Sequence, residues 1–429
     1  MPSPVSLRAI KQSIAILIVV WPLASGMALA QAGLPGVLGS RVEDFIPKVR
    51  QLNPELAAAT LDAAAAQARI DAAGRLPDPA LRTEFMDIDR RGSSVLPGRI
   101  GQIKYTFLQE FPLWGKRGLQ RDVARGEADS ADAKRRVMEL ELTARVKVAF
   151  TAYYAAHEAA RLTREITGTV RRIGDLANQR YAQGSGDVQE SIRAATELVM
   201  LEEELARLDA EKRRAAAQLR LLTGAGVNVT LADPRALRRL PPDAALSLPA
   251  LVERARTTNP AIAAEAGMIR SAEASRRLVD KSWYPDLTVG VSGVDRDRRF
   301  AGYEAMIEFK IPLQGGLRHA QARDAAARLG AARARQEAVA LRLEAELAEQ
   351  WAVYRAGGRI AALLHGTHLP QARLALNTAL RAYEAGSGPL LPALDAQRRY
   401  LQAGVEHLRA LVQQHASLAE IERIVGSDL

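Results

Sequence analysis

The feature that most constrains the fold is a six-residue segment that occurs twice. Residues Tyr181–Gly186 read YAQGSG, and residues Tyr383–Gly388 read YEAGSG. Each copy lies between a long stretch of helix-forming residues and a second helical stretch. Glycine at such a point adopts the left-handed conformation that ends one helix and reverses the chain into the next. The sequence therefore predicts two long helical hairpins with the same turn at their tips.

The helix that leads into each turn is too long for a compact domain. Between Arg117 and Gly184 there is no proline, and an unbroken helix of about 66 residues is about 100 Å long. A similar helix is expected from Gly316 to Tyr383. Leucines recur at coiled-coil spacing on the helices that follow the turns. Only 5% of the residues are aromatic, which is typical of paired long helices rather than of an enzyme core.

Two short segments with alternating polarity precede each long helix. Ile103, Tyr105 and Phe107 alternate with polar residues, which is the pattern of a strand with one apolar face. Strands are predicted at about residues 79–88, 101–111, 285–294 and 303–312. Their length and pattern suit tilted strands of an outer-membrane barrel. A membrane tolerates no open sheet edge, so the four strands must pair with those of other subunits, and three copies give a twelve-stranded barrel.

The polar faces of these strands would then surround a water-filled lumen. The residues expected to line it are Lys104, Glu110, Glu304, Glu308 and Lys310. A soluble helical protein with a small sheet is the alternative. That alternative leaves charged strand faces with nothing to pack against, and it does not explain why the strand pair occurs twice.

The repeat gives a domain plan for the whole chain. Residues 1–30 have the basic start, apolar run and small-residue cleavage site of a secretory signal, and an uncleaved anchor is the alternative. The first repeat is expected at 31–224 with its long hairpin at 117–224. A proline-rich linker follows at 225–250, and the second repeat covers 251–429 with its hairpin at 316–426.

Composition excludes several kinds of chemistry. The net charge is +10, but the basic residues are dispersed among glutamates and lack neighbouring aromatics, so nucleic-acid binding is not expected. The absence of cysteine excludes disulfides, thiolate ligands and a lipid anchor on a cysteine. No nucleophile, base and orienting group stand together, so neither enzyme activity nor a cofactor is predicted. His365 and His368 are a weak metal candidate because no third ligand adjoins them.

The order of these elements resembles the TolC-like outer-membrane efflux channel family over nearly the whole mature chain. Residues 76–79 (LPDP) and 109–117 (QEFPLWGKR) are similar to the heavy-metal-cation (cobalt-zinc-cadmium type) branch of tripartite RND efflux systems. The resemblance implies a mainly α protein with membrane β strands that forms a homotrimer: a twelve-stranded barrel continued by a helical periplasmic tunnel. It implies a passive duct in the outer membrane of a Gram-negative bacterium, served by a periplasmic membrane-fusion adaptor and an inner-membrane RND pump.

Two alternatives remain beside that function. One is the same channel serving drug or small-organic efflux. The other is a periplasmic coiled-coil scaffold without a pore. The duplicated strand pair favours the channel, since a scaffold has no use for strands of membrane length.

The resemblance also assigns roles at the hairpin tips. The turn residues that would dock the adaptor are Gly184, Ser185, Gly186, Gly386, Ser387 and Gly388. Tyr383 matches a tyrosine that bonds to an acidic residue, and Glu190 matches that acidic residue. Asp395 matches a residue that rings the entrance, and Asp187 is assigned to the same region. The sequence departs from the family at Pro392, where a second acid is expected, and at Gly388, where a gating arginine is expected; Arg193 is the substitute considered.

Overall fold

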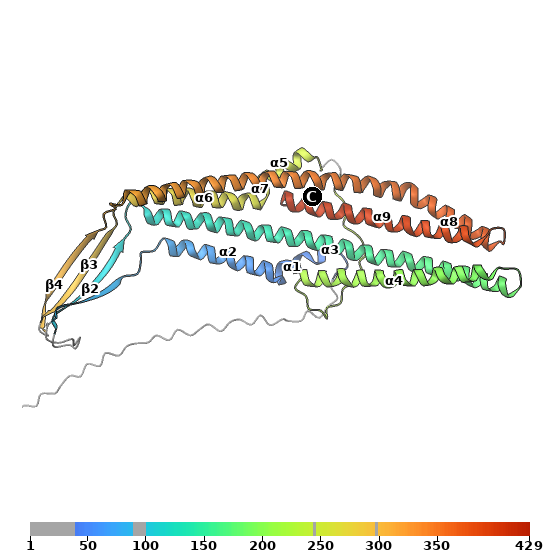
Figure 1. The fold of residues 1–429 in the computed structure, drawn as a ribbon, viewed down its shortest axis with the longest axis horizontal. Helices are drawn as coiled ribbons and strands as arrows, with labels where there is room; N and C mark the ends of the chain where they lie inside the picture. The colour runs from blue at the N-terminus through green and yellow to red at the C-terminus, as the bar shows by residue number, and fades with distance from the viewer. Residues whose placement is uncertain (1–38, 89–99, 243–245, 297–298) are drawn as a thin grey trace, which may run out of the picture. The chain divides into compact units, whose positions relative to one another are not determined.

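A computed structural model describes residues 39–88, 100–242, 246–296 and 299–429. All of these belong to one compact unit, residues 36–429. The predicted signal at 1–30 lies outside the described residues, as does most of the loop between the first two strands. The helices are α1 Ile46–Leu52, α2 Pro54–Ala73, α3 Lys116–Ala182, α4 Val188–Leu222, α5 Leu248–Thr258, α6 Pro260–Asp280, α7 Gly315–Leu363, α8 Leu369–Glu384 and α9 Leu390–Val425. The strands are β1 Ala80–Ile88, β2 Ile100–Phe111, β3 Leu287–Arg296 and β4 Arg299–Phe309 (Figure 1).

The helices form a layer with α3 near its middle. On one side α3 contacts α2 and α4, and on the other it contacts α6 and α9, which α7 and α8 cover in turn (Figure 1). The prediction of an unbroken helix before the first turn is confirmed, because α3 runs for 67 residues. Within the described residues no helix is both long and apolar enough to cross a membrane.

An asparagine joins the end of each hairpin to the helix that precedes the strands. The side chain of Asn53 accepts hydrogen bonds from the first turn of α2 and donates one to Leu222 O at the end of α4, at 2.7 Å. Asn259 repeats this at the start of α6 and donates to Ile424 O of α9 at 2.6 Å. Each asparagine therefore accepts from at least one free N–H at the start of one helix and donates to a free carbonyl at the end of another. The side-chain amide thus links the ends of two helices.

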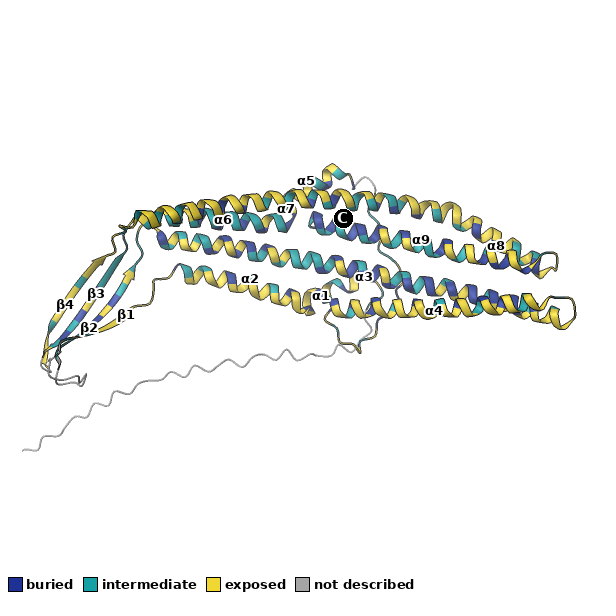
Figure 2. Cartoon of the chain, in the orientation of Figure 1, coloured by how far each residue is buried: buried dark blue, intermediate teal, exposed yellow. Residues whose placement is uncertain are grey.

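Small residues allow the two halves of the layer to approach closely. Gly126 of α3 faces α6 so tightly that a Cβ there would lie 2.4 Å from the backbone nitrogen of Ser271. Gly267 of α6 faces α3 in the same way, and its Cβ would lie 2.7 Å from Ser130 N. Figure 2 shows buried residues concentrated along such helix-to-helix contacts. The first repeat is thus held to the second by backbone packing that no larger residue permits.

The second long helix differs from the expectation. One long helix was expected from about Gly316 to Tyr383, but a π-helical turn at Leu364–His368 separates α7 from α8. Pro370 lies just beyond that turn and cannot donate a backbone hydrogen bond. In a regular helix its ring would clash with the carbonyl four residues earlier, and the wider π turn relieves the clash.

The four strands form one antiparallel sheet in the order β1-β2-β3-β4. The fourth strand spans Arg299–Phe309 rather than about 303–312. It starts earlier because β3 continues to Arg296, which pairs with Arg299. It ends earlier because β3 begins only at Leu287, after Pro285. Lys310 therefore lies one residue beyond the strand, where its N–H bonds to Asp286 O at 3.4 Å.

Candidate functional site at the hairpin tips

The two tips have the same backbone geometry. Gly184 and Gly386 both adopt left-handed conformations, with φ of 73° and 74°. Ser185 N donates to Arg180 O at 2.9 Å, and Ser387 N donates to Ala382 O at 3.0 Å. These are the bonds of a glycine-terminated helix, so the predicted turns are confirmed. Gly184, Ser185, Gly386 and Ser387 are exposed, while Gly186 and Gly388 are partly covered.

Tyr383 connects the two hairpins just behind the turns. Its side chain is 1% exposed, and its hydroxyl donates to Glu190 Oε2 at 3.3 Å. Burial raises the pKa of Tyr383, and the negative charge of Glu190 raises it further. The phenol therefore stays protonated and able to donate. The structure brings together the two residues that the family resemblance pairs.

An arginine missed by the sequence reasoning completes this contact. Arg180 of α3 donates from Nη2 to Tyr383 O at 2.7 Å, and its guanidinium lies 4.6 Å from the centre of the Tyr383 ring. Arg193, considered as the gating arginine, is exposed, and its side chain has no ion pair or hydrogen bond to another described residue. The sequence signal was available, since Arg180 directly precedes the repeated turn. An arginine there can reach the carbonyls that end the facing helix.

The other residues assigned to the entrance have local partners. Asp187 caps α4, because its side chain accepts from Gln189 N at 2.9 Å. Asp395 is exposed on α9 and pairs with Arg399 one turn later, at 2.9 Å. In the described part of the chain, neither side chain forms a hydrogen bond or an ion pair with Tyr383, Glu190 or Arg180. Pro392 lies in the first turn of α9, where proline is tolerated.

An ion pair between a buried carboxylate and a half-exposed arginine forms a second connection between the hairpins. Glu197 of α4 is 3% exposed, and Arg398 of α9 donates from Nε to both of its carboxylate oxygens at 3.0 Å. Arg398 Nη2 adds a third bond to Oε2. In the sequence, Glu197 lies among the coiled-coil leucines of α4. That pattern does not indicate an ion pair, because the partner of Glu197 lies on the other hairpin. Sequence reasoning could not find this pair.

The sheet separates its polar and apolar residues by face. The charged residues Lys104, Glu110, Glu304 and Glu308 lie on one face in the observed register. Lys104 pairs with Glu304 across β3, while Glu110 and Glu308 lie on either side of Thr288. The opposite face carries exposed apolar side chains: Leu81, Phe85, Tyr105, Phe107, Val291, Tyr303, Ile307 and Phe309.

The histidines do not assemble a metal centre in the described residues, where no three or more candidate ligands cluster. His365 and His368 lie in the π turn and are both exposed. The ring of His365 stacks instead on His407 of α9, with 5.3 Å between ring centres. Burial lowers the pKa of His407, and the neighbouring His365 lowers it further. The pairing across helices depends on tertiary structure, not on the spacing in the sequence.

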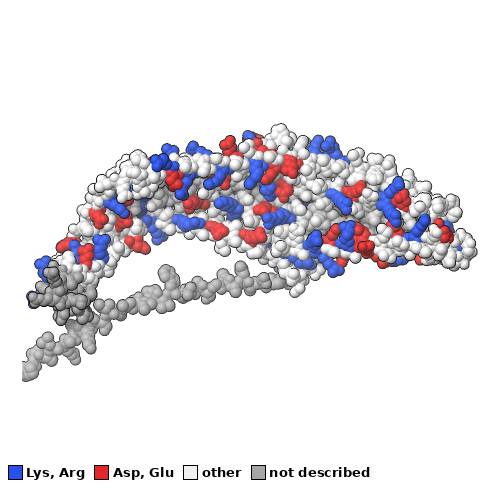
Figure 3. All heavy atoms as spheres, viewed as in Figure 1, with Lys and Arg blue, Asp and Glu red and all other residues white. Residues whose placement is uncertain are grey.

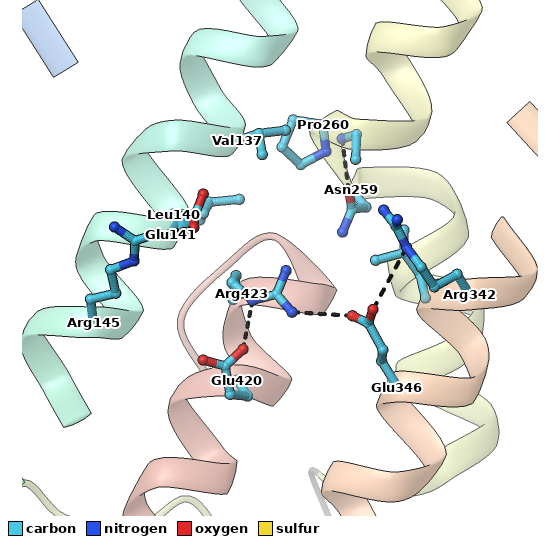
Figure 4. A pocket seen from close by; sticks show the side chains of 12 residues that line it. Val137, Leu140, Glu141, Arg145, Asn259, Pro260, Arg342, Glu346, Glu420 and Arg423 are labelled. Atoms are coloured by element: carbon cyan, nitrogen blue, oxygen red, sulfur yellow. Dashed lines mark hydrogen bonds and ion pairs between the residues drawn. The ribbon is translucent and has the colours of Figure 1, made fainter. Parts of the chain in front are cut away.

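A cavity of about 460 Å³ lies where α9 ends against the start of α6, between α3 and α7 (Figure 4). Its lining includes Arg342, Glu346, Glu420 and Arg423. Arg423 bonds to Glu420 at 2.6 Å and to Glu346 at 3.2 Å, and Arg342 lies 3.6 Å from Glu346. These charged side chains are therefore paired with one another across the joint between α7 and α9. Figure 3 shows the same mixing of both charge signs over the visible face.

Comparison with known proteins decides the family. The model of the outer membrane efflux protein family matches residues 45–225 and 251–427. The chain belongs to the outer membrane efflux protein family. The two matched segments lie in the two repeats of this chain and leave out the proline-rich stretch between them.

Two curated relatives of this efflux family come from Cupriavidus metallidurans. The cobalt-zinc-cadmium resistance protein CzcC is 28% identical over 73% of this chain and 74% of its own. The nickel and cobalt resistance protein CnrC is 31% identical over 69% of this chain and 67% of its own. Among solved structures, the outer-membrane channel OprN has a TM-score of 0.76 at 20% identity and covers 90% of each chain. The fold is therefore that of the TolC-like channels.

Proposed function

We propose that this chain is the outer-membrane channel of a tripartite efflux system and exports heavy-metal cations. The observation that carries the channel is the four-stranded sheet, with exposed aromatic and aliphatic side chains on one face and charged side chains on the other. Such a sheet suits lipid on one side and water on the other. The channel would be a passive duct, driven by an inner-membrane RND pump through a periplasmic adaptor at the hairpin tips.

The open edges of the sheet support a ring of several copies. Among the described strands, β1 and β4 each have one unpaired edge, so β4 of one copy would pair with β1 of the next. Two copies would give eight strands, whose interior side chains fill, whereas three give twelve strands and an open lumen. We infer a homotrimer whose lumen is lined by Lys104, Glu110, Glu304 and Glu308, with Lys310 at its periplasmic rim.

The helices support the same ring through their internal repeat. Helices α6 and α9 are covered by α3 on one side and by α7 on the other. In the described part of the chain, α2 and α4 pack mainly on α3, and no helix covers their other side as α7 covers α6 and α9. Their uncovered side exposes Leu61, Val199 and Met200, while α7 and α8 expose Leu341, Leu363 and Leu374. By the symmetry of the repeat, α7 of a neighbouring copy would cover α2 and α4 as α3 covers α6 and α9. Large exposed apolar faces mark such interfaces.

The proposal for the cargo rests on the relatives and on the carboxylates. CzcC and CnrC are resistance proteins for cobalt, zinc, cadmium and nickel by their names. Three copies of Asp395 around the axis would give a carboxylate ring at the entrance, and Glu110 and Glu308 would repeat the negative charge in the barrel. Rings of carboxylates favour cations.

A deletion strain tests the cargo, and the purified protein tests the channel. Loss of the gene should sensitise cells to cobalt, nickel, zinc or cadmium salts, and the wild-type gene should restore growth. Sensitivity to antibiotics alone would instead identify a drug channel. In detergent the protein should run as a heat-modifiable trimer that conducts ions in planar bilayers. A water-soluble monomer without conductance would overturn the channel and favour a coiled-coil scaffold.

A further inference from the structure

One buried side chain in the hairpin core has no hydrogen-bonding partner in the described chain. Gln397 of α9 is 0% exposed, and neither its Nε2 nor its Oε1 has a partner among the described residues. Leu394 and Leu401, which lie three residues before and four after, belong to the apolar cluster that joins the two hairpins near their tips. Residues at these spacings share a helix face. Gln397 therefore places a polar amide at a position of the helix face where the neighbouring residues are leucines.

A buried amide without hydrogen bonds opposes the packing that buries it. In coiled coils such residues sometimes fix the register of the helices. Here the turn between α8 and α9 already fixes the register, so the hairpin does not need an amide at this position for that purpose. The corresponding residue of the first hairpin, counted from the shared turn, is the exposed Ala195, so the buried amide is a feature of the second hairpin alone, and its presence calls for another role.

The next residue, Arg398, has the opposite effect, because it stabilises the contact between the hairpins. Arg398 holds Glu197 of the first hairpin with three hydrogen bonds, and Tyr383 holds Glu190 nearer the tip. One turn of α9 therefore carries both a strong contact between the hairpins and a buried group that regains hydrogen bonds only when it reaches water. Arg398 therefore favours closed hairpins, whereas the adjacent Gln397 favours their separation.

We propose that Gln397 is a positioning residue of the periplasmic gate that keeps the closed arrangement only marginally favoured. This inference rests on the proposed channel function. When the hairpins move apart, water reaches the amide and its hydrogen bonds are recovered, so Gln397 lowers the free energy of the open state relative to the closed one. An adaptor that docks at the tips then needs little binding energy to open the duct.

The test is Gln397→Leu, which keeps a similar volume and removes the polar atoms. The matched control is Gln402→Leu on the same helix, because Gln402 is exposed and its side chain bonds, among the described residues, only to Glu406. Hydrogen exchange of the α9 amides is measured on the purified full chain, and opening is measured as conductance in planar bilayers. We expect Gln397→Leu to slow exchange by about tenfold and to reduce the open fraction by about tenfold. The control should change neither.

The two measurements separate this inference from the channel itself. Faster exchange in Gln397→Leu would mean that the amide stabilises the closed hairpins, and unchanged exchange would mean that it is neutral; either result overturns the inference. Slower exchange with unchanged conductance would overturn the gating role and leave only a packing effect. If the wild-type protein does not conduct at all, the channel proposal fails, and the gating role fails with it.

Discussion

Replacing Arg398 with glutamine should open the hairpins, because it leaves Glu197 buried without its partner. The Glu197 side chain is 4% exposed, whereas that of Arg398 is 56% exposed. Breaking a buried ion pair costs about 3–5 kcal/mol, and a hydrogen bond to a charged group contributes about 1.5–3 kcal/mol. Because water reaches Arg398, we expect about 2–3 kcal/mol per protomer, which corresponds to a roughly 30- to 150-fold shift toward the open arrangement.

A double-mutant cycle measures this contact directly. Arg398→Gln, Glu197→Gln and the double variant are compared by thermal unfolding in detergent and by conductance in planar bilayers. The double variant should be more stable than the sum of the single effects predicts, with a coupling energy of about 2 kcal/mol. Glu197→Gln alone should be the milder single change, because a neutral amide is less costly to bury than a carboxylate.

The reasoning would be refuted by additivity. If the two single effects add within about 0.5 kcal/mol and conductance matches the wild type, the pair does not hold the hairpins together. A matched control is Arg399→Gln, since within the part of the chain that the structure describes Arg399 pairs only with Asp395, on its own exposed helix face. That variant should leave stability nearly unchanged, as isolated surface pairs do.

Three other changes test the rest of the structure. Tyr383→Phe removes the hydroxyl bound to Glu190 and should cost about 1 kcal/mol, measured as a lower Tm with a modest rise in conductance; an unchanged Tm would count against the contact. Asn259→Ala removes both the cap of α6 and the bond to Ile424 O and should cost about 2 kcal/mol by denaturant unfolding, whereas a cost near zero would show that the joint is not stabilising. Burial lowers the pKa of His415 to about 4, and Arg238 adds to the effect, so stability is full above pH 6.5 and should fall by about 3 kcal/mol as the pH drops to 4. His415→Leu should reduce that pH dependence by the same amount, and an identical pH profile would contradict the assignment.

Local signals in the sequence located most elements because each one follows from a short-range rule. The repeated glycine turn, the proline-free run of α3 and the alternation in β2 specify backbone states directly. The Tyr383–Glu190 contact was reached only through the family resemblance. The π turn was missed although Pro370 signals it, because a proline within a helical pattern can either end the helix or be absorbed by a local change.

The sequence by itself determined the hairpins, the strands and the faces of the strands, since these depend on residues a few positions apart. Tertiary structure alone decided that Arg180, rather than Arg193, contacts Tyr383, that Glu197 meets Arg398, and that His365 pairs with His407. Each of these contacts joins separate helices. Its geometry depends on the distance between the two helix axes and on which face each helix turns toward the other. Gln397 is the clearest case: its sequence position marks an amide among leucines, but only the packed structure leaves that amide fully buried without a partner in the described chain.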